Sequence, residues 1–438
     1  MNTQPNLFIP ADLRKRIFFT LMILALYRVG VAVPTPGVNA DAVLAFFQSK
    51  SSGIFGMFNT FTGGALKRFS VFALGIMPYI SASIIFQLLQ SAIPYLESLK
   101  KEGEAGRKKI NQYTRYATVL LSIIQGYAIA NWLSGQNPGG QPLVSQPNFG
   151  HFLLPFELVT VATLTAGAMF IMWLGEQITE RGVGNGASLI IFAGIAAGIP
   201  RGAMSLYKMV TGGEMSALMA ILLILGMVFV IGIIVFIEAG QRKITVQYSQ
   251  RGMNAQKQVS HLPLKLNFSG VIPPIFASSL LMFPATMAQF IKAPWMQEIQ
   301  QSLTPTGAVY NVIFVALIIF FSFFYTEIVF NPTEVADNLK KYGGFIPGIR
   351  AGKNTAEYIK RVIDRLTVAG SLYLSAVCIM PTLLTSKLHL PFYFGGTSLL
   401  ILVGVALDTV QQIQSHLLTA RYDGLVRGVK MRSRRVQF

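Results

Sequence analysis

The amino-acid sequence predicts an all-α polytopic membrane protein with ten membrane-spanning helices. Apolar residues make up 52% of the chain, charged residues only 12%, and the mean hydropathy is +0.52. A soluble protein of this size carries about twice that charged fraction. The apolar residues also form long runs, such as residues 217–237, that can cross ~30 Å of hydrocarbon as helices.

Ten such runs give the predicted spans. They lie at residues 17–35, 71–94, 116–134, 152–174, 183–200, 217–237, 271–291, 308–330, 366–385 and 392–410. Three basic residues precede the first run, but it is too long for a secretory signal peptide and has no small-residue cleavage pattern. We therefore expect a retained first helix. Cys378 is the only cysteine, so no intrachain disulfide can form.

The basic residues predict which side of the membrane each loop faces. With the N-terminus inside, 28 of the 36 Lys and Arg residues fall on inner segments, seven fall on outer segments, and Arg28 lies within the first span. The positive-inside rule then predicts that both termini are cytoplasmic. Such an excess also attracts anionic phospholipids, at ~1 kcal/mol per basic residue near the surface.

Ten spans divide the chain into two halves of five. The N-terminal half comprises residues 1–200 and the C-terminal half residues 217–410, with an external hinge loop at 201–216 and a basic cytoplasmic tail at 411–438. Because each half has an odd number of spans, the two halves are expected to have inverted orientations. In transporters, this arrangement places the pathway at the interface between the halves.

Two inner loops, residues 238–270 and 331–365, are long and basic and are predicted to be folded. The alternation in KITVQY predicts one strand of a hairpin, with a return strand near QVSHL. Asn331-Pro332 is typical of a helix start, and Asn354 with Glu357 can cap a second helix. Folded basic loops favour docking of a large partner with an acidic or RNA surface.

Several function classes lose support because their residue patterns are missing. The four histidines lie far apart and no HExxH spacing occurs, so no metal site is predicted. The GVGNG stretch follows a span and lacks the Lys-Ser/Thr of a phosphate-binding loop, so it is interpreted as a close helix contact. No acidic residue lies at mid-membrane, where coupled carriers keep one. A solute transporter and a membrane enzyme are therefore weaker alternatives, and the protein is expected to have no enzymatic activity.

Residues 62–89 combine features that a simple membrane anchor does not need. Lys67 and Arg68 lie in a short apolar segment that breaks at Gly75 and Pro78. Hydrocarbon penalises both the charges and the unsatisfied backbone at such a break. The segment is interpreted as a mobile element in an aqueous funnel. Snorkelling of the two charges from an outer loop is the simpler alternative.

Six stretches, in order over essentially the whole chain, resemble the bacterial SecY family, the central subunits of Sec protein-conducting channels. They are GGALKRFSVFALGIMPYISASIIFQLL, KKEGEAGRKKINQYTRY, MWLGEQITERGVGNGAS, SHLPLKLN, GVIPPIFASS and GFIPGIRAGKNTAEYI. The resemblance implies two inverted five-helix halves around an hourglass pore in the bacterial plasma (inner) membrane. It implies a passive channel that translocates unfolded secretory polypeptides and releases apolar segments sideways into lipid, without a cofactor.

The resemblance also implies roles for individual residues. A ring at the pore constriction would consist of Ile80, Ile84, Ala187, Ile191, Ile275 and Ile401. A plug, formed as a half-helix within residues 62–73, would include Gly63, Gly64, Ala65, Leu66, Lys67, Arg68 and Phe69. A lateral gate between spans two, three, seven and eight would include Gln87, Ser278 and Ser279. At the ring, Ala187 departs from the larger aliphatic residue that the family often has.

Partners follow from the same resemblance. The basic loops would dock the SecA motor ATPase or the ribosome, which supply the force. The docking residues would be Arg242, Lys243, Arg251, Lys340, Lys341, Arg350 and Lys353. SecE and SecG subunits would complete the channel, and its substrates would be signal peptides and unfolded preproteins. Ala351 stands where the family more often has proline, which puts the rigidity of that turn in doubt.

Overall fold

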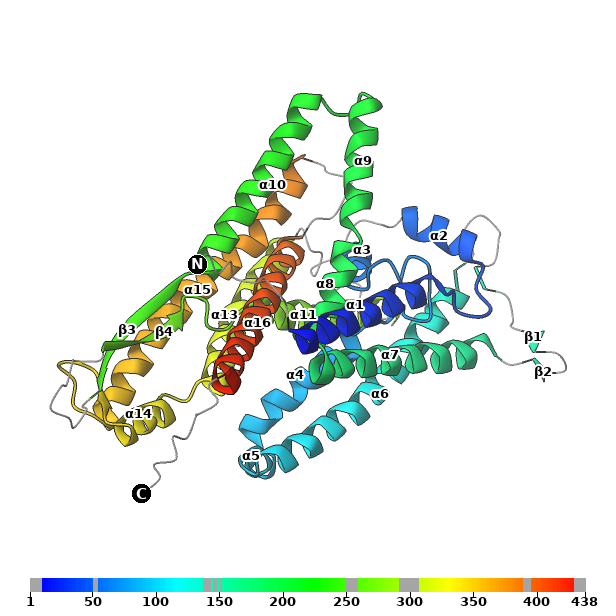
Figure 1. The fold of residues 1–438 in the computed structure, drawn as a ribbon. Helices are drawn as coiled ribbons and strands as arrows, with labels where there is room; N and C mark the ends of the chain where they lie inside the picture. The colour runs from blue at the N-terminus through cyan, green and yellow to red at the C-terminus, as the bar shows by residue number, and fades with distance from the viewer. Residues whose placement is uncertain are drawn as a thin grey trace, which may run out of the picture.

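The computed structural model describes residues 10–49, 54–136, 143–144, 148–149, 152–153, 155–248, 259–290, 307–388 and 395–428. Each of the ten predicted spans corresponds to a helix or a pair of helices (Figure 1). They are α1 (Ala11–Ala32), α4 (Met77–Ala92), α6 (Glu104–Ser134), α7 (Phe156–Arg181), α8 (Gly186–Ala196) with α9 (Ile199–Thr211), α10 (Ala217–Glu238), α11 (Ile272–Phe290), α13 (Ala308–Val329), α15 (Lys353–Leu388) and α16 (Gly396–Gly428).

The lengths and hydropathies of these helices fit a polytopic membrane protein. Within the described residues, seven helices are long and apolar enough to cross a membrane. An eighth is possible if α4 and α5 (Pro94–Lys101), which meet at 98°, count as one broken span. The helix α1 opens with several charged residues.

Three boundaries differ from the sequence prediction. Most of the predicted external loop, residues 201–216, is helical. It belongs to α9, which together with α8 forms one apolar unit, Gly186–Thr211. The second span begins at Met77, since Gly75 has a positive φ of 58° and residues 71–76 form turns. The predicted tail begins inside α16, which continues to Gly428.

The helices form two groups that are inclined to each other in Figure 1, one from each half of the chain. The halves meet where α8 contacts α16 and where α11 contacts α4 and α6. The helix α5, the β3–β4 hairpin and α14 (Pro332–Lys341) lie at one end of the molecule, which we call the basic-loop end. At the opposite end lie α9, α2 (Ala40–Ser49), α3 (Ile54–Phe61) and the paired strands β1 (Asn148–Phe149) and β2 (Phe152–Leu153).

The two basic loops fold together as a small unit at the basic-loop end. Strand β3 (Gln241–Tyr248) pairs antiparallel with β4 (Val259–Lys265) and with β5 (Gly344–Phe345), which confirms the predicted hairpin. The helix start at Asn331 is also confirmed, because its Oδ1 accepts a hydrogen bond from Thr333 N at 3.2 Å. The predicted cap at Asn354 is wrong, since α15 already begins at Lys353, after the left-handed turn at Gly352. An apolar cluster fastens the unit to α15 through Ile244, Val246, Leu264, Ile346, Ile359 and Ile363.

The GVGNG turn between α7 and α8 is hydrogen-bonded to two other helices, α1 of the same half and α16 of the C-terminal half. Val183 N donates to Thr20 Oγ1 of α1 at 3.1 Å, and Gly184 N donates to Gln412 Oε1 of α16 at 2.9 Å. A Cβ added to Gly186 would collide with a backbone carbonyl of α7. The interpretation of this motif as a close helix contact is therefore confirmed.

We predict that Gly186→Ala destabilises the fold, because the new methyl group must push backbone apart, at a cost of ~1–3 kcal/mol. The thermal unfolding midpoint of the purified protein in detergent checks this. The matched control is Gly226→Ala in α10, where a Cβ meets no atom within 4 Å. Equal midpoints for the two variants would contradict the close packing at Gly186.

Candidate functional site

A cavity of about 330 Å³ lies between the two halves of the chain. Its walls come from α4, α6, α7 and α8 on one side and from α11 and α13 on the other. Its polar part points toward the basic-loop end, because Asn111 and Arg115 belong to the early turns of α6 and Glu176 and Glu180 to the last turns of α7. The cavity is thus a polar recess that enters the molecule from the basic-loop end.

The predicted ring residues form the apolar limit of this recess. Four of the six line it: Ile80, Ala187, Ile191 and Ile275. The other two, Ile84 and Ile401, do not line it but belong to the same apolar cluster. The five isoleucines are at most 5% exposed, whereas Ala187 is partly exposed. The structure therefore places four of the six positions at the wall of one cavity and the other two in the apolar cluster that adjoins it.

One ion pair fixes the cavity wall where α6 meets α7. Arg115 Nε and Nη2 donate to the two carboxylate oxygens of Glu176 at 2.9 and 2.7 Å. The two residues are 61 positions apart, and sequence analysis did not connect them. Bidentate pairing of this kind is directional as well as attractive, so it sets the spacing of the two helices. No group of three or more His, Cys, Asp or Glu residues in the described part of the chain could hold a metal ion.

The predicted plug residues lie together at the opposite end, but they do not form a half-helix. Residues 62–69 make successive turns after α3. Their φ angles are positive at Gly63 (66°), Gly64 (92°) and Phe69 (46°), which is incompatible with a continuous right-handed helix. Ala65, Leu66 and Phe69 are at most 3% exposed and belong to the same apolar cluster as the ring. Arg68 is exposed, whereas Lys67 is half-buried.

Three side chains hold the backbone of this segment. Tyr27 Oη donates to Thr62 O at 3.1 Å, and Arg28 Nη1 donates to Gly63 O at 3.0 Å. Asn59 Oδ1 accepts from Lys67 N at 3.0 Å. The role of Arg28 within an apolar span was not predicted, because its partner is a backbone carbonyl that no sequence pattern marks. Side chains of α1 and α3 thus provide hydrogen-bond partners for backbone groups of this irregular segment.

Four positive charges gather around the plug segment. Arg201 Nη1 of α9 lies 3.0 Å from the position that a Cβ on Gly64 would occupy, and Arg28 lies beside Gly63. Burial, and then the charge of Arg201, lower the pKa of Lys67. None of Arg28, Lys67, Arg68 and Arg201 forms an ion pair within the described residues. Apolar packing and hydrogen bonds therefore hold the segment in place against mutual repulsion of its charges.

The helices of the predicted lateral gate are neighbours. The helix α11 contacts α4 and α6 of the other half, as well as α13. Gln87 Nε2 donates to Ser83 Oγ at 3.1 Å at the edge of the cavity, and Ser278 Oγ donates to Ile275 O at 2.9 Å. Ser279 is 2% exposed, and its Oγ has no hydrogen-bond partner among the described residues. The predicted gate residues thus include one buried hydroxyl group, that of Ser279, whose desolvation is not offset by a hydrogen bond.

The predicted docking residues lie on the small folded unit at the basic-loop end. Six of the seven are exposed: Arg242, Lys243, Lys340, Lys341, Arg350 and Lys353. The seventh, Arg251, lies outside the described residues. The turn that carries Arg350 is fixed to the start of α15, because Thr355 Oγ1 donates to Arg350 O at 3.0 Å. The side chain of Arg350 is thereby presented to solvent from a fixed backbone.

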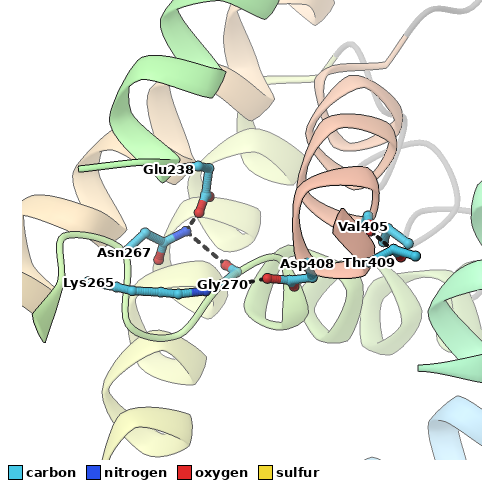
Figure 2. Close-up of polar contacts among 7 residues, drawn as sticks. All are labelled: Glu238, Lys265, Asn267, Gly270, Val405, Asp408 and Thr409. Carbon is cyan, nitrogen blue, oxygen red and sulfur yellow. Dashed lines mark hydrogen bonds and ion pairs between the residues drawn. The ribbon is translucent and has the colours of Figure 1, made fainter. Parts of the chain in front are cut away.

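A polar junction joins the basic hairpin to the helices of the C-terminal half (Figure 2). Asn267 Nδ2 donates to Glu238 Oε1 at the end of α10 at 2.7 Å and to Gly270 O, just before α11, at 3.0 Å. Lys265 Nζ at the end of β4 lies 3.4 Å from Asp408 Oδ1 of α16. Displacement of the hairpin would therefore pull directly on the start of the gate helix α11.

Comparison with known proteins shows which family has this architecture. The family model SecY matches residues 70–410. The chain belongs to the SecY family. A protein translocase subunit SecY from Pseudomonas aeruginosa is 47% identical over 429 residues, covering 96% of this chain and 95% of that protein. A protein-conducting channel of known structure has a TM-score of 0.65 at 17% identity, covering 94% and 95% of the two chains. The canine Sec61 channel in a ribosome complex gives 0.62 at 17%, with the same coverage.

We predict that Ser279→Ala stabilises this SecY-family chain. A buried hydroxyl group without a partner costs ~1–3 kcal/mol, and alanine removes it. The thermal unfolding midpoint in detergent should rise, whereas the control Ser278→Ala, which loses its bond to Ile275 O, should give no gain. A midpoint for Ser279→Ala at or below that of the unsubstituted protein would mean that the hydroxyl group is bonded.

Proposed function

We propose that the protein is a passive protein-conducting channel of the bacterial plasma membrane. It translocates unfolded secretory polypeptides and releases apolar segments sideways into lipid, driven by a motor ATPase or the ribosome. One observation carries the proposal. Ile80, Ile191 and Ile275 line the polar recess, and all five ring isoleucines belong to the same apolar cluster as Leu66 and Phe69 of the plug segment. In the proposal, the five isoleucines form one layer, the isoleucine layer, between the recess and the plug segment.

The isoleucine layer is suited to a pore that must both seal and yield. A narrow apolar constriction excludes water and ions by dewetting, and branched aliphatic side chains adapt to a polypeptide of varying width. No hydrogen-bond specificity is required, because the substrates share only an extended backbone. Ala187 leaves less bulk at its position in the ring, on the side where the cavity touches α8.

The plug segment is suited to displacement. Its side-chain hydrogen bonds are few, and water in an aqueous funnel can replace each of them when the segment moves, so each costs little to break. Repulsion among Arg28, Lys67, Arg68 and Arg201 opposes closure. The left-handed turn at Gly75 and Pro78 in the first turn of α4 supply a hinge.

Sideways release would use the contact between α11 and the pair α4 and α6. Lipid lies outside this contact and the isoleucine layer inside it, so separating the helices opens a path for an apolar segment. Ser279 lowers the cost of separation, because its hydroxyl group has no hydrogen-bond partner within the described residues and gains water or substrate contacts when the gate opens. Gln87 can keep its bond to Ser83 of the same helix in both states while it gains water.

The basic-loop end is proposed to face the cytoplasm, with both chain termini on that side. Its exposed basic residues would bind a SecA-type motor or ribosomal RNA and protein, and the junction at Asn267 would pass the docking force to α11. The fold shared with a Sec61 channel from a ribosome complex supports the second partner. SecE- and SecG-type subunits and anionic phospholipids would complete the assembly.

Deletion of residues 64–69 tests the channel and its plug together. Vesicles containing the channel, its partner subunits and a motor ATPase should protect a secretory preprotein from protease, and the deletion should retain that activity. Leakage of K⁺ through the resting channel should rise at least about tenfold, because the deletion removes the buried Leu66 and Phe69 that close the outer side of the ring.

The control for this deletion is the double variant Lys67→Gln with Arg68→Gln. Arg68 is exposed and Lys67 half-buried, and the buried Leu66 and Phe69 are retained, so the leak should stay near that of the unsubstituted channel. Unchanged leakage after the deletion would contradict the plug assignment. Absence of protected preprotein with the unsubstituted channel and all partners present would contradict the channel itself.

A further inference from the structure

The start of the plug segment meets α8 by direct contact of two backbones. A Cβ added to Gly194 of α8 would lie 3.0 Å from Phe61 O and 3.1 Å from Gly63 N. A Cβ added to Gly63 would in turn lie 2.7 Å from Gly194 Cα. These distances are shorter than ordinary van der Waals contacts, so neither position has room for a side chain. Small residues permit this kind of close approach at helix contacts in membrane proteins.

Gly194 lies next to the predicted constriction. Ala187, Ile191 and Gly194 are spaced at i, i+4 and i+7, so they share one face of α8. Ala187 and Ile191 line the cavity between the halves. Gly194 lies about 4.5 Å further along the helix axis than Ile191, at the rise of an α-helix. One face of α8 thus carries two predicted ring positions and, one turn later, the contact with the plug segment.

The plug backbone at this contact has little freedom to yield. Gly63 N donates to Thr60 O at 3.2 Å, and Gly64 N donates to Asn59 O at 2.9 Å. The segment is therefore hydrogen-bonded to the last turn of α3, and α3 itself contacts α8. A side chain at position 194 cannot be accommodated by a shift of one residue. It would push the segment and the end of α3 away from α8 together.

We propose that Gly194 is the seat of the plug: its missing side chain lets the plug segment close against α8, and the bulk at this position sets how often the closed state opens. This inference rests on the proposed channel function and adds a positioning residue to it. With glycine at position 194, residues 61–63 reach α8 while Leu66 and Phe69 stay buried in the apolar cluster. A larger residue favours the displaced segment, because overpacking a tight contact by even one methyl group is destabilising.

The test uses Gly194→Ala and Gly194→Val in vesicles that contain the channel and its partner subunits. Leakage of K⁺ through the resting channel should rise about fivefold with alanine, since overpacking by one methyl group shifts an equilibrium by that order. Valine should bring the leakage close to that of the deletion of residues 64–69. Both variants should still protect a secretory preprotein when the motor ATPase is present, which shows that they fold.

Two controls separate the seat from other effects of the substitution. Gly198→Ala adds the same methyl group four residues further along, where the residue is exposed and a Cβ would meet only Ile195 O within 4 Å. Its leakage should equal that of the unsubstituted channel. Gly194→Ala combined with the deletion of residues 64–69 should leak no more than the deletion alone, because no plug is left to displace.

The position of the segment is measured independently of leakage. Thr62 is 1% exposed, so a single cysteine there, in a Cys378→Ala background, should react slowly with a maleimide. Gly194→Ala should raise the labelling rate about fivefold, because labelling follows the population of the displaced segment. Gly198→Ala should leave the rate unchanged.

The outcomes distinguish the seat from the channel. Unchanged leakage and labelling in Gly194→Ala, equal increases in Gly198→Ala, or additional leakage in the combined variant would overturn the inference. If labelling rises in Gly194→Ala while neither this variant nor the deletion leaks, the proposed plug fails and the contact at Gly194 stands. If the unsubstituted channel with all its partners protects no preprotein, the channel function fails, and the labelling rates still decide the role of Gly194.

Discussion

The backbone of residues 62–76 sets the constraint on which the rest of the structure depends. Hydrocarbon tolerates no unsatisfied N–H or C=O groups, so non-helical backbone at membrane depth must be enclosed by protein or by water. Here α1 and α3 enclose it, with Tyr27, Arg28 and Asn59 as hydrogen-bond partners. Its buried residues Ala65, Leu66 and Phe69 belong to the same apolar cluster as the five isoleucines of the proposed ring.

The molecule connects its two ends through a short series of contacts. The folded unit at the basic-loop end is rigid, since its strands and α14 share an apolar cluster with α15. Asn267 links this unit to the start of α11, and α11 carries Ile275 of the proposed ring and Ser278 and Ser279 of the proposed gate. In the proposed channel, force applied at the docking surface would therefore reach the gate and the constriction through one helix. The buried, unpaired hydroxyl group of Ser279 keeps that contact less stable than an apolar one.

Sequence reasoning succeeded where local patterns decide the structure. Apolar runs located a helix or a pair of helices at each of the ten predicted positions, and alternation located the β3–β4 hairpin, because both signals depend on near neighbours in the chain. The expected half-helix in the plug segment was wrong, because the φ angles of Gly63, Gly64 and Phe69 are positive. Sequence reasoning also missed the Arg115–Glu176 pair and the partner of Arg28, because these contacts join distant segments or a side chain to a backbone carbonyl.

The path of the substrate is the most direct test of this account. Single cysteines at Ile84, Ile191 and Ile401, in a Cys378→Ala background, would be probed by a crosslinker on a secretory polypeptide stalled midway across reconstituted vesicles. A control cysteine at Leu225 lies on the outer surface of α10, where the side chain is 66% exposed. Strong adducts at the three isoleucine positions and few at the control would place the polypeptide within the ring. Equal labelling at all four positions, or none at the ring while translocation proceeds, would mean that the polypeptide crosses elsewhere.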